Sequence, residues 1–368
     1  VKSQRTFEAA KAWLTECMHD CVSHSQCLQK RNDFAPTRLI EVLRHLDGKL
    51  TARLVQDLKG DRIRWACLSY CWGGDQPSKT TKANFTERLE TLPLVDLPKT
   101  ITDVIPVTSQ MDIRYLWIDA LCIIPDNPDD VACEIASMPE VYMHGVCTIS
   151  ASQASTSVEG FLQDHQTDEM HHQPIPIHKR AWCYQERILS SRIVDFGHTQ
   201  IQWICKSKRD ADDGRVDRAA ITDALIESSV NNLLSPQERW FDVVSKYTRR
   251  DMTFVGDRVL AVSAVAAYFA LQFDCEYVAG FWKDKLALQL AWIAGRPKYS
   301  RPGIYIAPSW QVRSSWACIS DSVFWTISDD LVPAVEVVDC RVHLRHSFAP
   351  FGAVTNGYLL LRAQIREM

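Results

Sequence analysis

The stretch "RYLWIDALCII", Arg114 to Ile124, is an apolar run with one acid, Asp119, inside it. Such a run is typical of a buried β-strand, where an unpaired carboxylate costs several kcal/mol. Asp119 must therefore have a partner, or it must stand where the strand leaves the core. Ligands of open parallel sheets bind beyond the carboxyl ends of the strands, and we expect Asp119 to lie there. The alternative is that Asp119 caps the next turn or pairs with Arg114 or Lys99.

The segments around that stretch alternate between strand-like and helix-like patterns. Strands are expected at 65–70, 115–118 and 147–150, with helices at 99–111 and 128–142 between them. Strands separated by helices of this length predict crossover connections and parallel neighbours. Further helices are expected at 6–19 and 180–189, an edge strand at 36–43, and a hairpin of strands at 192–197 and 201–206. The fold class is therefore α/β, with a parallel sheet core.

The last third of the chain has a different pattern. Helices are expected at 235–247, 258–273 and 278–293, followed by a β-rich tail from Tyr305. We divide the chain into an N-terminal segment with a Cys/His cluster (1–61), the α/β core (62–215) and a C-terminal helical plus β region (216–368).

Composition limits the kinds of partner. The chain has 368 residues, of which 46% are apolar and 23% charged, with a net charge of −4. No basic run attracts nucleic acid or anionic lipid, and the longest apolar segment is shorter than the ~20 residues that cross a bilayer. We expect no nucleic acid and no membrane as partner, but small molecules, another protein or a second copy of the chain.

The thirteen cysteines suit reduced thiols better than a disulfide framework. Their number is odd, and Cys67, Cys122, Cys147 and Cys205 lie within or beside apolar runs, where a thiol behaves as a small hydrophobe. We expect at most one disulfide and a cytoplasmic location.

An ordered series of motifs carries a family resemblance. The motifs are "CLSYCWGG", "LPKTITDVI", "IRYLWIDALCII", "TISAS", "GFL", "RAWCYQERILSSRIVDFG", "IQWIC", "YVAGFWKD", "QLAW" and "APSW". In this order they resemble the HET domain of fungal heterokaryon-incompatibility proteins and segments that commonly follow it. The resemblance implies a TIR-like, flavodoxin-related fold and a role in triggering cell death after non-self recognition. Some TIR domains hydrolyse NAD with one glutamate.

The sequence also departs from the family pattern. Val131 stands where tryptophan is frequent, Pro125 stands where glutamine is usual, and no arginine closely follows "GFL". These departures suggest a HET-like enzyme diverted to small-molecule biosynthesis as one alternative function.

Candidate substrate-binding residues follow the first strand of the core. They are Ser69, Tyr70, Cys71, Trp72 and Gly73. We expect them at the same sheet edge as Asp119, with Gly73 and Gly74 allowing close approach of the backbone to a ligand.

Glu134 is the candidate catalytic carboxylate, together with Asp119. On the helix expected at 128–142 it lies beside the apolar stripe of Val131, Ile135, Met138 and Tyr142. In NAD cleavage it would stabilise the oxocarbenium-like charge as nicotinamide leaves. A solvated helix glutamate is the plainer interpretation.

The segment "RAWCYQER" supplies further candidate binding residues. They are Arg180, Trp182, Gln185, Glu186 and Arg187. Arginine can bind a pyrophosphate with two hydrogen bonds and tryptophan can stack on a base, whereas an internal network of ion pairs is the alternative.

The N-terminal "CMHDCVSHSQC" contains thiols and imidazoles that suit zinc. Its candidate ligands are Cys17, His19, Cys21, His24 and Cys27, but no second pair such as C-x-x-C completes a four-ligand site. We therefore assign no metal. Cys71 and Cys183 are candidate nucleophiles without an identified base.

Three functions of different classes remain open. The first is an NAD(P) glycohydrolase-type enzyme with NAD or a related nucleotide as substrate and no assigned cofactor. The second is a non-enzymatic signalling module that binds protein partners, and the third is the biosynthetic enzyme.

Overall fold

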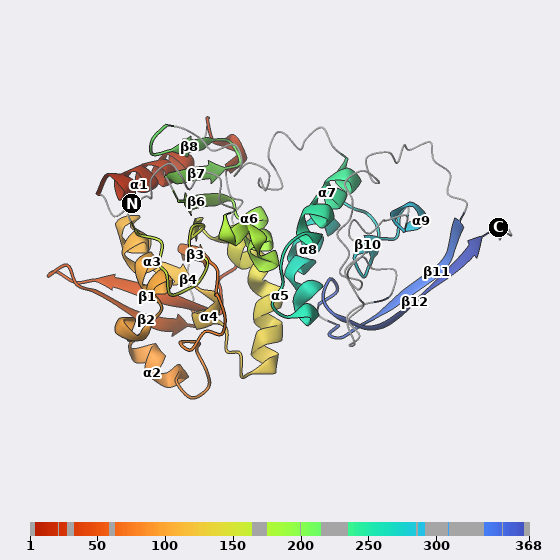
Figure 1. Cartoon of the computed structure of the whole chain (residues 1–368), viewed down its shortest axis with the longest axis horizontal. Coiled ribbons are helices and arrows are strands. Elements are labelled where there is room, and N and C mark those ends of the chain that lie inside the picture. The colour runs from red at the N-terminus through yellow and green to blue at the C-terminus, as the bar shows by residue number, and fades with distance from the viewer. Residues whose placement is uncertain are drawn as a thin grey trace. The chain divides into compact units, whose positions relative to one another are not determined.

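The computed structural model divides into two units, which are described separately. The first comprises Val1–Val230 and the second Asn231–Met368. The structure describes residues 4–20, 22–27, 33–58, 63–163, 175–198, 200–214, 235–284, 286–290, 308, 335–347 and 349–363. Figure 1 shows the path of the chain.

A mixed eight-stranded sheet forms the centre of the first unit. Its order is β2-β1-β4-β3-β5-β6-β7-β8 among the described residues. The strands are β1 (Arg38–Arg44), β2 (Leu50–Gln56), β3 (Trp65–Ser69), β4 (Tyr115–Trp117), β5 (Cys147–Ser150), β6 (Arg192–Phe196), β7 (Ile201–Cys205) and β8 (Arg209–Ala211). The α/β class is confirmed.

The four middle strands are parallel. β3 pairs with β4 on one side and with β5 on the other, and β5 pairs with β6. This confirms that the strands expected at 65–70, 115–118 and 147–150 are parallel neighbours. In chain order the parallel strands stand 2-1-3-4, as in flavodoxin-like sheets, whose ligands bind where the order reverses. Here that point lies between the ends of β3 and β5.

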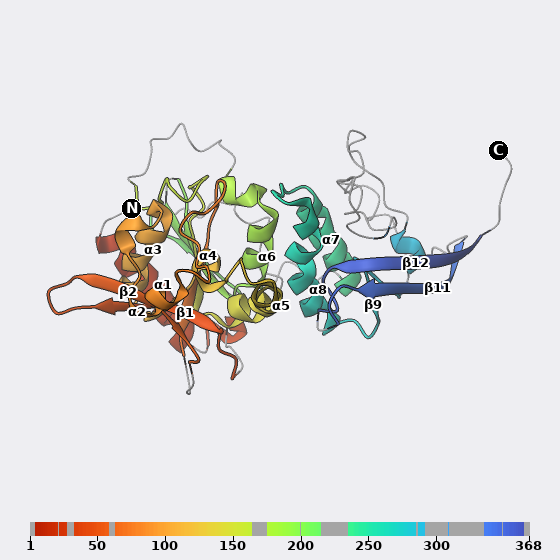
Figure 2. The same ribbon diagram turned by 90° about the horizontal axis from the view of Figure 1, so that it is seen from below.

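Helices cover both faces of these strands. α1 (Gln4–His19) and α3 (Lys99–Gln110) lie on one side, and α5 (Pro128–His144) and α6 (Ala181–Leu189) lie on the other (Figures 1 and 2). Double cover explains the continuous apolar runs of β3 and β5, all of whose residues are buried. Short elements complete the unit: η1 (Ser25–Cys27), α2 (Phe85–Glu90), η2 (Leu94–Asp96), α4 (Asp119–Cys122) and η4 (Pro176–Lys179).

The sheet extends beyond the strands that sequence patterns predicted. The strand expected at 36–43 as an edge is β1, which instead pairs with β2 and β4. The edge prediction was wrong because β2 has a short mixed sequence, "LTARLVQ", that gave no strand signal. β8 likewise pairs with β7, within the polar run "KSKRDADDGRVDR". The stretch 1–61 thus contributes α1, β1 and β2 to the first unit.

The second unit begins with a well-capped helix. α7 (Pro236–Thr248) has Ser235 and Glu238 in a reciprocal capping box, a known helix start signal. Its Trp240 packs edge-on against Phe269 and Trp282, and all three side chains are buried.

One helix predicted in this unit is shorter than expected, and another prediction was wrong. The segment 258–273 breaks into η7 (Val255–Arg258), η8 (Leu260–Val262) and α8 (Ser263–Ala270). The segment 278–293 instead contains β9 (Tyr277–Val278), β10 (Phe281–Trp282) and α9 (Leu286–Gln289). In the second segment the reason is local: Ala279 and Gly280 adopt positive φ between β9 and β10, a conformation that ends a helix.

The last described elements form a long hairpin. β11 (Val335–Leu344) pairs antiparallel with β12 (Val354–Ala363). The other strands expected after Tyr305 lie largely outside the described residues.

Two further features of the described residues concern their cysteines and their apolar helices. The described cysteines are all free thiols. Within the described residues, no helix combines the length and the apolar character that crossing a bilayer requires.

Gly73 allows the loops after β3 and β5 to meet. It has φ +74°, and an added Cβ would lie 2.3 Å from Thr156 Cγ2 and 2.8 Å from Thr156 Cα. The Ser157 amide also donates to Trp72 O at 3.2 Å. We expected Gly73 to let the backbone approach a ligand. It instead lets the backbone approach the protein's own loop after β5.

We predict that Gly73→Ala destabilises the first unit strongly. Positive φ and the contact with Thr156 together cost about 2–4 kcal/mol. Gly48→Ala is the matched control, because Gly48 has φ +82° but no atom within 4 Å of its added Cβ. It should cost only about 1 kcal/mol. Denaturant unfolding measures both, and equal losses would show that the contact with Thr156 is unimportant.

Candidate functional site

Asp119 stands where β4 leaves the core. The strand ends at Trp117, and Asp119 begins α4. Its Oδ2 accepts a hydrogen bond from Trp72 Nε1 at 2.9 Å, and its Oδ1 accepts one from the Ala120 amide at 2.6 Å. Burial raises the pKa of Asp119, and these two bonds act against that rise. Asp119 is therefore hydrogen-bonded to one residue that follows β3 and to one that follows β4.

The ion pairs offered as alternatives do not form at Asp119. Arg114 pairs with Glu41 of β1 at 2.5 Å, and Lys99 pairs with Asp103. The other alternative, a bond to the following turn, is present as the Ala120 contact.

Glu186 brings a second carboxylate to the carboxyl end of β3. It lies on α6 and is only 4% exposed. Ser69, the last residue of β3, donates its hydroxyl to Glu186 Oε2 at 2.5 Å. Burial raises the pKa of Glu186 to about 8, and the charge of Asp119 adds to the rise. Near neutral pH the Glu186 carboxyl group is therefore mainly protonated.

Arg180 and Tyr70 add a cation and a buried hydroxyl to this group. Burial lowers the pKa of Arg180, but Cys183, Cys71, Glu186 and Asp119 raise it above its ordinary value. No carboxylate of the described residues forms an ion pair with its guanidinium.

Tyr70 is 3% exposed. Its hydroxyl interacts with the Asp119 carboxylate. Burial and the Asp119 charge raise its pKa well above the ordinary value, so the group stays a neutral donor. Such groups can bind an anionic or hydroxyl-rich ligand.

Arg187 contacts Asp195 rather than Asp119 or Glu186. It is buried, and its Nη1 lies 2.9 Å from Asp195 Oδ2 on β6. Burial acts to raise the pKa of Asp195, but Arg187 and Ser152 lower it below its usual range. Of the alternatives for "RAWCYQER", the internal ion pair is present at Arg187. Trp182 is half-buried on the same helix.

The described partners of Glu134 differ from those of Asp119 and Glu186. It is 2% exposed, which excludes the solvated interpretation. Its Oε1 lies 3.3 Å from Arg38 Nη2, and the same guanidinium nitrogen bonds Asp130 at 2.6 Å. Burial raises the pKa of Glu134, whereas the Thr37 hydroxyl and Arg38 lower it. Its described partners thus hold α5 to β1.

The two candidate nucleophiles have neutral thiols. Burial raises the pKa of Cys71 to about 11 and that of Cys183 well above its ordinary value. Both pack with Ile177. A thiolate is the reactive form, so the surroundings do not favour nucleophilic catalysis here.

The N-terminal Cys/His segment meets a residue that sequence spacing did not indicate. Cys17, His24 and Cys27 converge with Cys205, at the end of β7, and all four are buried. His19 is exposed at the end of α1, and Cys21 lies outside the described residues. His24 and Cys205 are 181 positions apart, so only a prediction of the α1–β7 contact could have joined them.

These features define an α/β domain with a polar site at the carboxyl edge of its parallel sheet. Residues 65–177 match the family model described as Heterokaryon incompatibility protein (HET), so this segment is similar to that family. Searches found no matching curated protein and no matching solved structure. Asp119 and Glu134 lie inside the matched segment, whereas Glu186 and Cys205 lie beyond it but in the same folded unit.

We predict that Glu186→Gln makes the protein more stable at high pH. The pKa of Glu186 is about 8 in the folded chain and about 4.5 when unfolded. The folded state therefore holds a proton that the unfolded state has lost, and wild-type stability falls between these two pH values. The neutral amide avoids this loss, so its advantage should grow by on the order of 2–4 kcal/mol from pH 5 to pH 9.

Denaturant titrations at several pH values measure this difference. Glu90→Gln is the control, since Glu90 is exposed and should give a pH-independent difference. A constant difference for Glu186→Gln would contradict the raised pKa.

Proposed function

We propose that this domain binds NAD or a related nucleotide at the carboxyl edge of its sheet and hydrolyses the bond to nicotinamide. The observation that carries the proposal is the coupled pair of carboxyl groups, Asp119 and Glu186, beside Arg180. Pairs of acids whose pKa values are pushed apart are typical of acid–base sites. The position between the ends of β3 and β5 is where sheets of this order bind ligands.

In this mechanism Asp119 acts as the ionised carboxylate. As the glycosidic bond breaks, its electrons leave with neutral nicotinamide and positive charge develops on the ribose carbon. An ionised carboxylate held by Trp72 and the Ala120 amide stabilises that charge without reorganising. Arg180 is suited to the pyrophosphate of the substrate.

Glu186 is suited to act as the general base. Water attacks the ribose carbon, and ionised Glu186 accepts its proton, giving ADP-ribose, nicotinamide and one proton released to solvent. Ser69 orients the carboxyl group through its hydrogen bond. Glu134 remains an alternative carboxylate, in which case its pairing with Arg38 would have to open.

Substitution of the three acids tests the proposal. Asp119→Asn should lower nicotinamide release from NAD on the order of a hundredfold, because an amide cannot stabilise positive charge. Glu186→Gln should lower it about 10²–10⁴-fold, whereas Glu134→Gln should retain most activity. Glu90→Gln, at an exposed glutamate, is the control for the effects of purification and of the substitution itself.

Rates are measured on purified full-length chain, with melting temperatures recorded for each variant. No release by folded wild type would reject the hydrolase and leave the protein-binding and biosynthetic functions. Loss of activity only in Glu134→Gln would retain hydrolysis but transfer the role to Glu134.

The pH profile gives an independent test of Glu186. Because the base must be ionised, kcat/KM should rise with pH and level off above about 8, the pKa of Glu186. A profile that falls over this range would contradict the assignment. We further propose that NAD loss in the cytoplasm links the reaction to an incompatibility response.

A further inference from the structure

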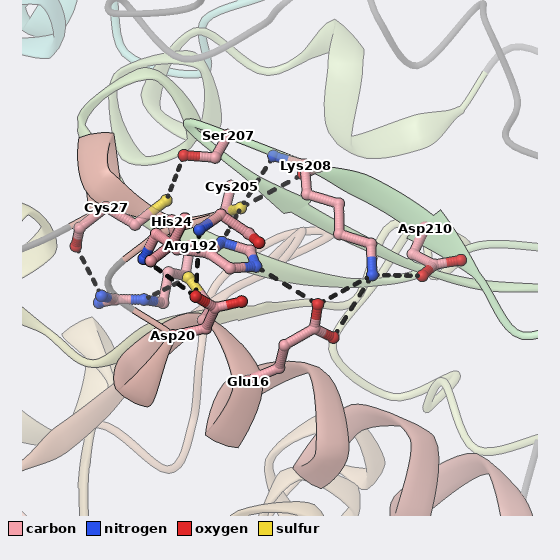
Figure 3. Close-up of polar contacts among 12 residues, drawn as sticks. Glu16, Asp20, His24, Cys27, Arg192, Cys205, Ser207, Lys208 and Asp210 are labelled. Atoms are coloured by element: carbon pink, nitrogen blue, oxygen red, sulfur yellow. Dashed lines mark hydrogen bonds and ion pairs between the residues drawn. The ribbon is translucent and has the colours of Figure 1, made fainter.

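We propose that Cys17, His24, Cys27 and Cys205 hold a structural zinc ion that ties the N-terminal helix to the central sheet. The labelled side chains of His24, Cys27 and Cys205 converge in Figure 3. Three thiols and one imidazole form a ligand set that zinc commonly takes in closed structural sites.

The distances fit a tetrahedral ion. The four ligand atoms all lie within 4.8 Å of one another, and Cys205 Sγ is 3.5 Å from His24 Nδ1. Zinc bonds of about 2.3 Å to sulfur and 2.0–2.1 Å to nitrogen give tetrahedron edges of about 3.5–3.8 Å. The ligand atoms therefore need to move by only about 1 Å to surround an ion.

The local backbone already presents two of the ligands together. Asp20 Oδ1 accepts the amides of Val22 and Ser23 at 2.9 and 3.1 Å. This turn leads into η1, where the Cys27 amide donates to His24 O at 2.8 Å. His24 and Cys27 are thereby brought to the end of α1, where Cys17 lies.

A buried cation faces the cluster. Arg192 is 3% exposed. Its Nε lies 3.1 Å from Cys17 Sγ, and its Nη2 donates to Cys27 O at 2.7 Å. No carboxylate in the described parts of the chain pairs with it. Three thiolates, one neutral imidazole and Zn²⁺ leave one negative charge, which this guanidinium would balance.

Two other contacts are typical of side chains that bind a metal ion. The Lys208 amide donates to Cys205 Sγ at 3.2 Å. With His24 Nδ1 as ligand, its Nε2–H faces Glu16 Oε1 at 3.6 Å, as Figure 3 shows. A carboxylate hydrogen-bonded to a ligating imidazole holds the ring in the required tautomer, and Glu16 needs to approach by only about 0.5 Å to form that bond.

The cluster differs from a catalytic metal centre and from a disulfide. Each ligand residue is at most 5% exposed, and four protein ligands leave no position for water or substrate. One disulfide would use two of the sulfurs and leave the third thiol and His24 unexplained. The zinc would thus stabilise the fold and take no part in the proposed reaction.

Metal analysis of the full-length chain tests the site. Protein expressed with zinc and purified without chelator should contain about one zinc ion per chain. Cobalt exchanged into wild-type protein should give the intense visible and thiolate charge-transfer bands of tetrahedral thiolate coordination. Stripping the metal should lower the melting temperature.

A matched pair of variants locates the ion. Cys205→Ser should reduce zinc content at fixed free zinc by at least about tenfold, whereas Cys133→Ser should leave it unchanged. Cys133 is exposed and lies outside the cluster. The wild-type cobalt spectrum decides the case if Cys205→Ser does not fold.

Several results would overturn the proposal. They are wild-type protein without zinc and without a thiolate–cobalt spectrum, an intact mass lower by two hydrogens with a disulfide mapped to these cysteines, or full zinc content in folded Cys205→Ser.

Discussion

The parallel pairing of β3 with both β4 and β5 is the constraint on which the rest of the first unit depends. Parallel neighbours direct their carboxyl ends to one edge of a sheet, so the exits of all three strands must share that edge. Trp72 after β3 can then reach Asp119 after β4. The loop after β5 meets the same exit at Gly73, where no side chain larger than hydrogen fits.

The buried carboxyl groups of this unit show how partners decide ionisation. Glu186 and Asp195 are both 4% exposed. Asp195 has Arg187 at 2.9 Å and a pKa below its usual range, whereas Glu186 has a neutral hydroxyl as its closest partner and a pKa of about 8. Successive residues of α6 thus serve different purposes: Arg187 holds the helix to β6, and Glu186 supplies a carboxyl group poised near neutrality.

The N-terminal segment is held to the unit in two ways. β1 lies inside the sheet between β2 and β4, and Arg38 at its start binds Asp130 and Glu134 of α5. α1 and η1 contact the other end of the sheet through Cys17, Cys27 and Arg192. The HET domain match begins at residue 65, yet the folded unit includes these earlier elements.

Local patterns in the sequence determined most elements of the core. The apolar runs at β3, β4 and β5, the helices between them and the acid at Asp119 were all predictable, because strand and helix periodicity depends on near neighbours. The order of motifs also indicated the HET domain. Helix boundaries after residue 255 were less predictable, since the positive φ of Ala279 interrupts an otherwise apolar segment.

Only the tertiary structure decided which distant side chains meet. Ser69 and Glu186 are 117 positions apart, and His24 and Cys205 are 181 apart. Their contacts depend on how crossovers order the strands and on which helix covers which face. No local pattern contains that information, so the sequence favoured Glu134, whereas the fold brought Glu186 to Asp119 and Cys205 to the N-terminal cysteines.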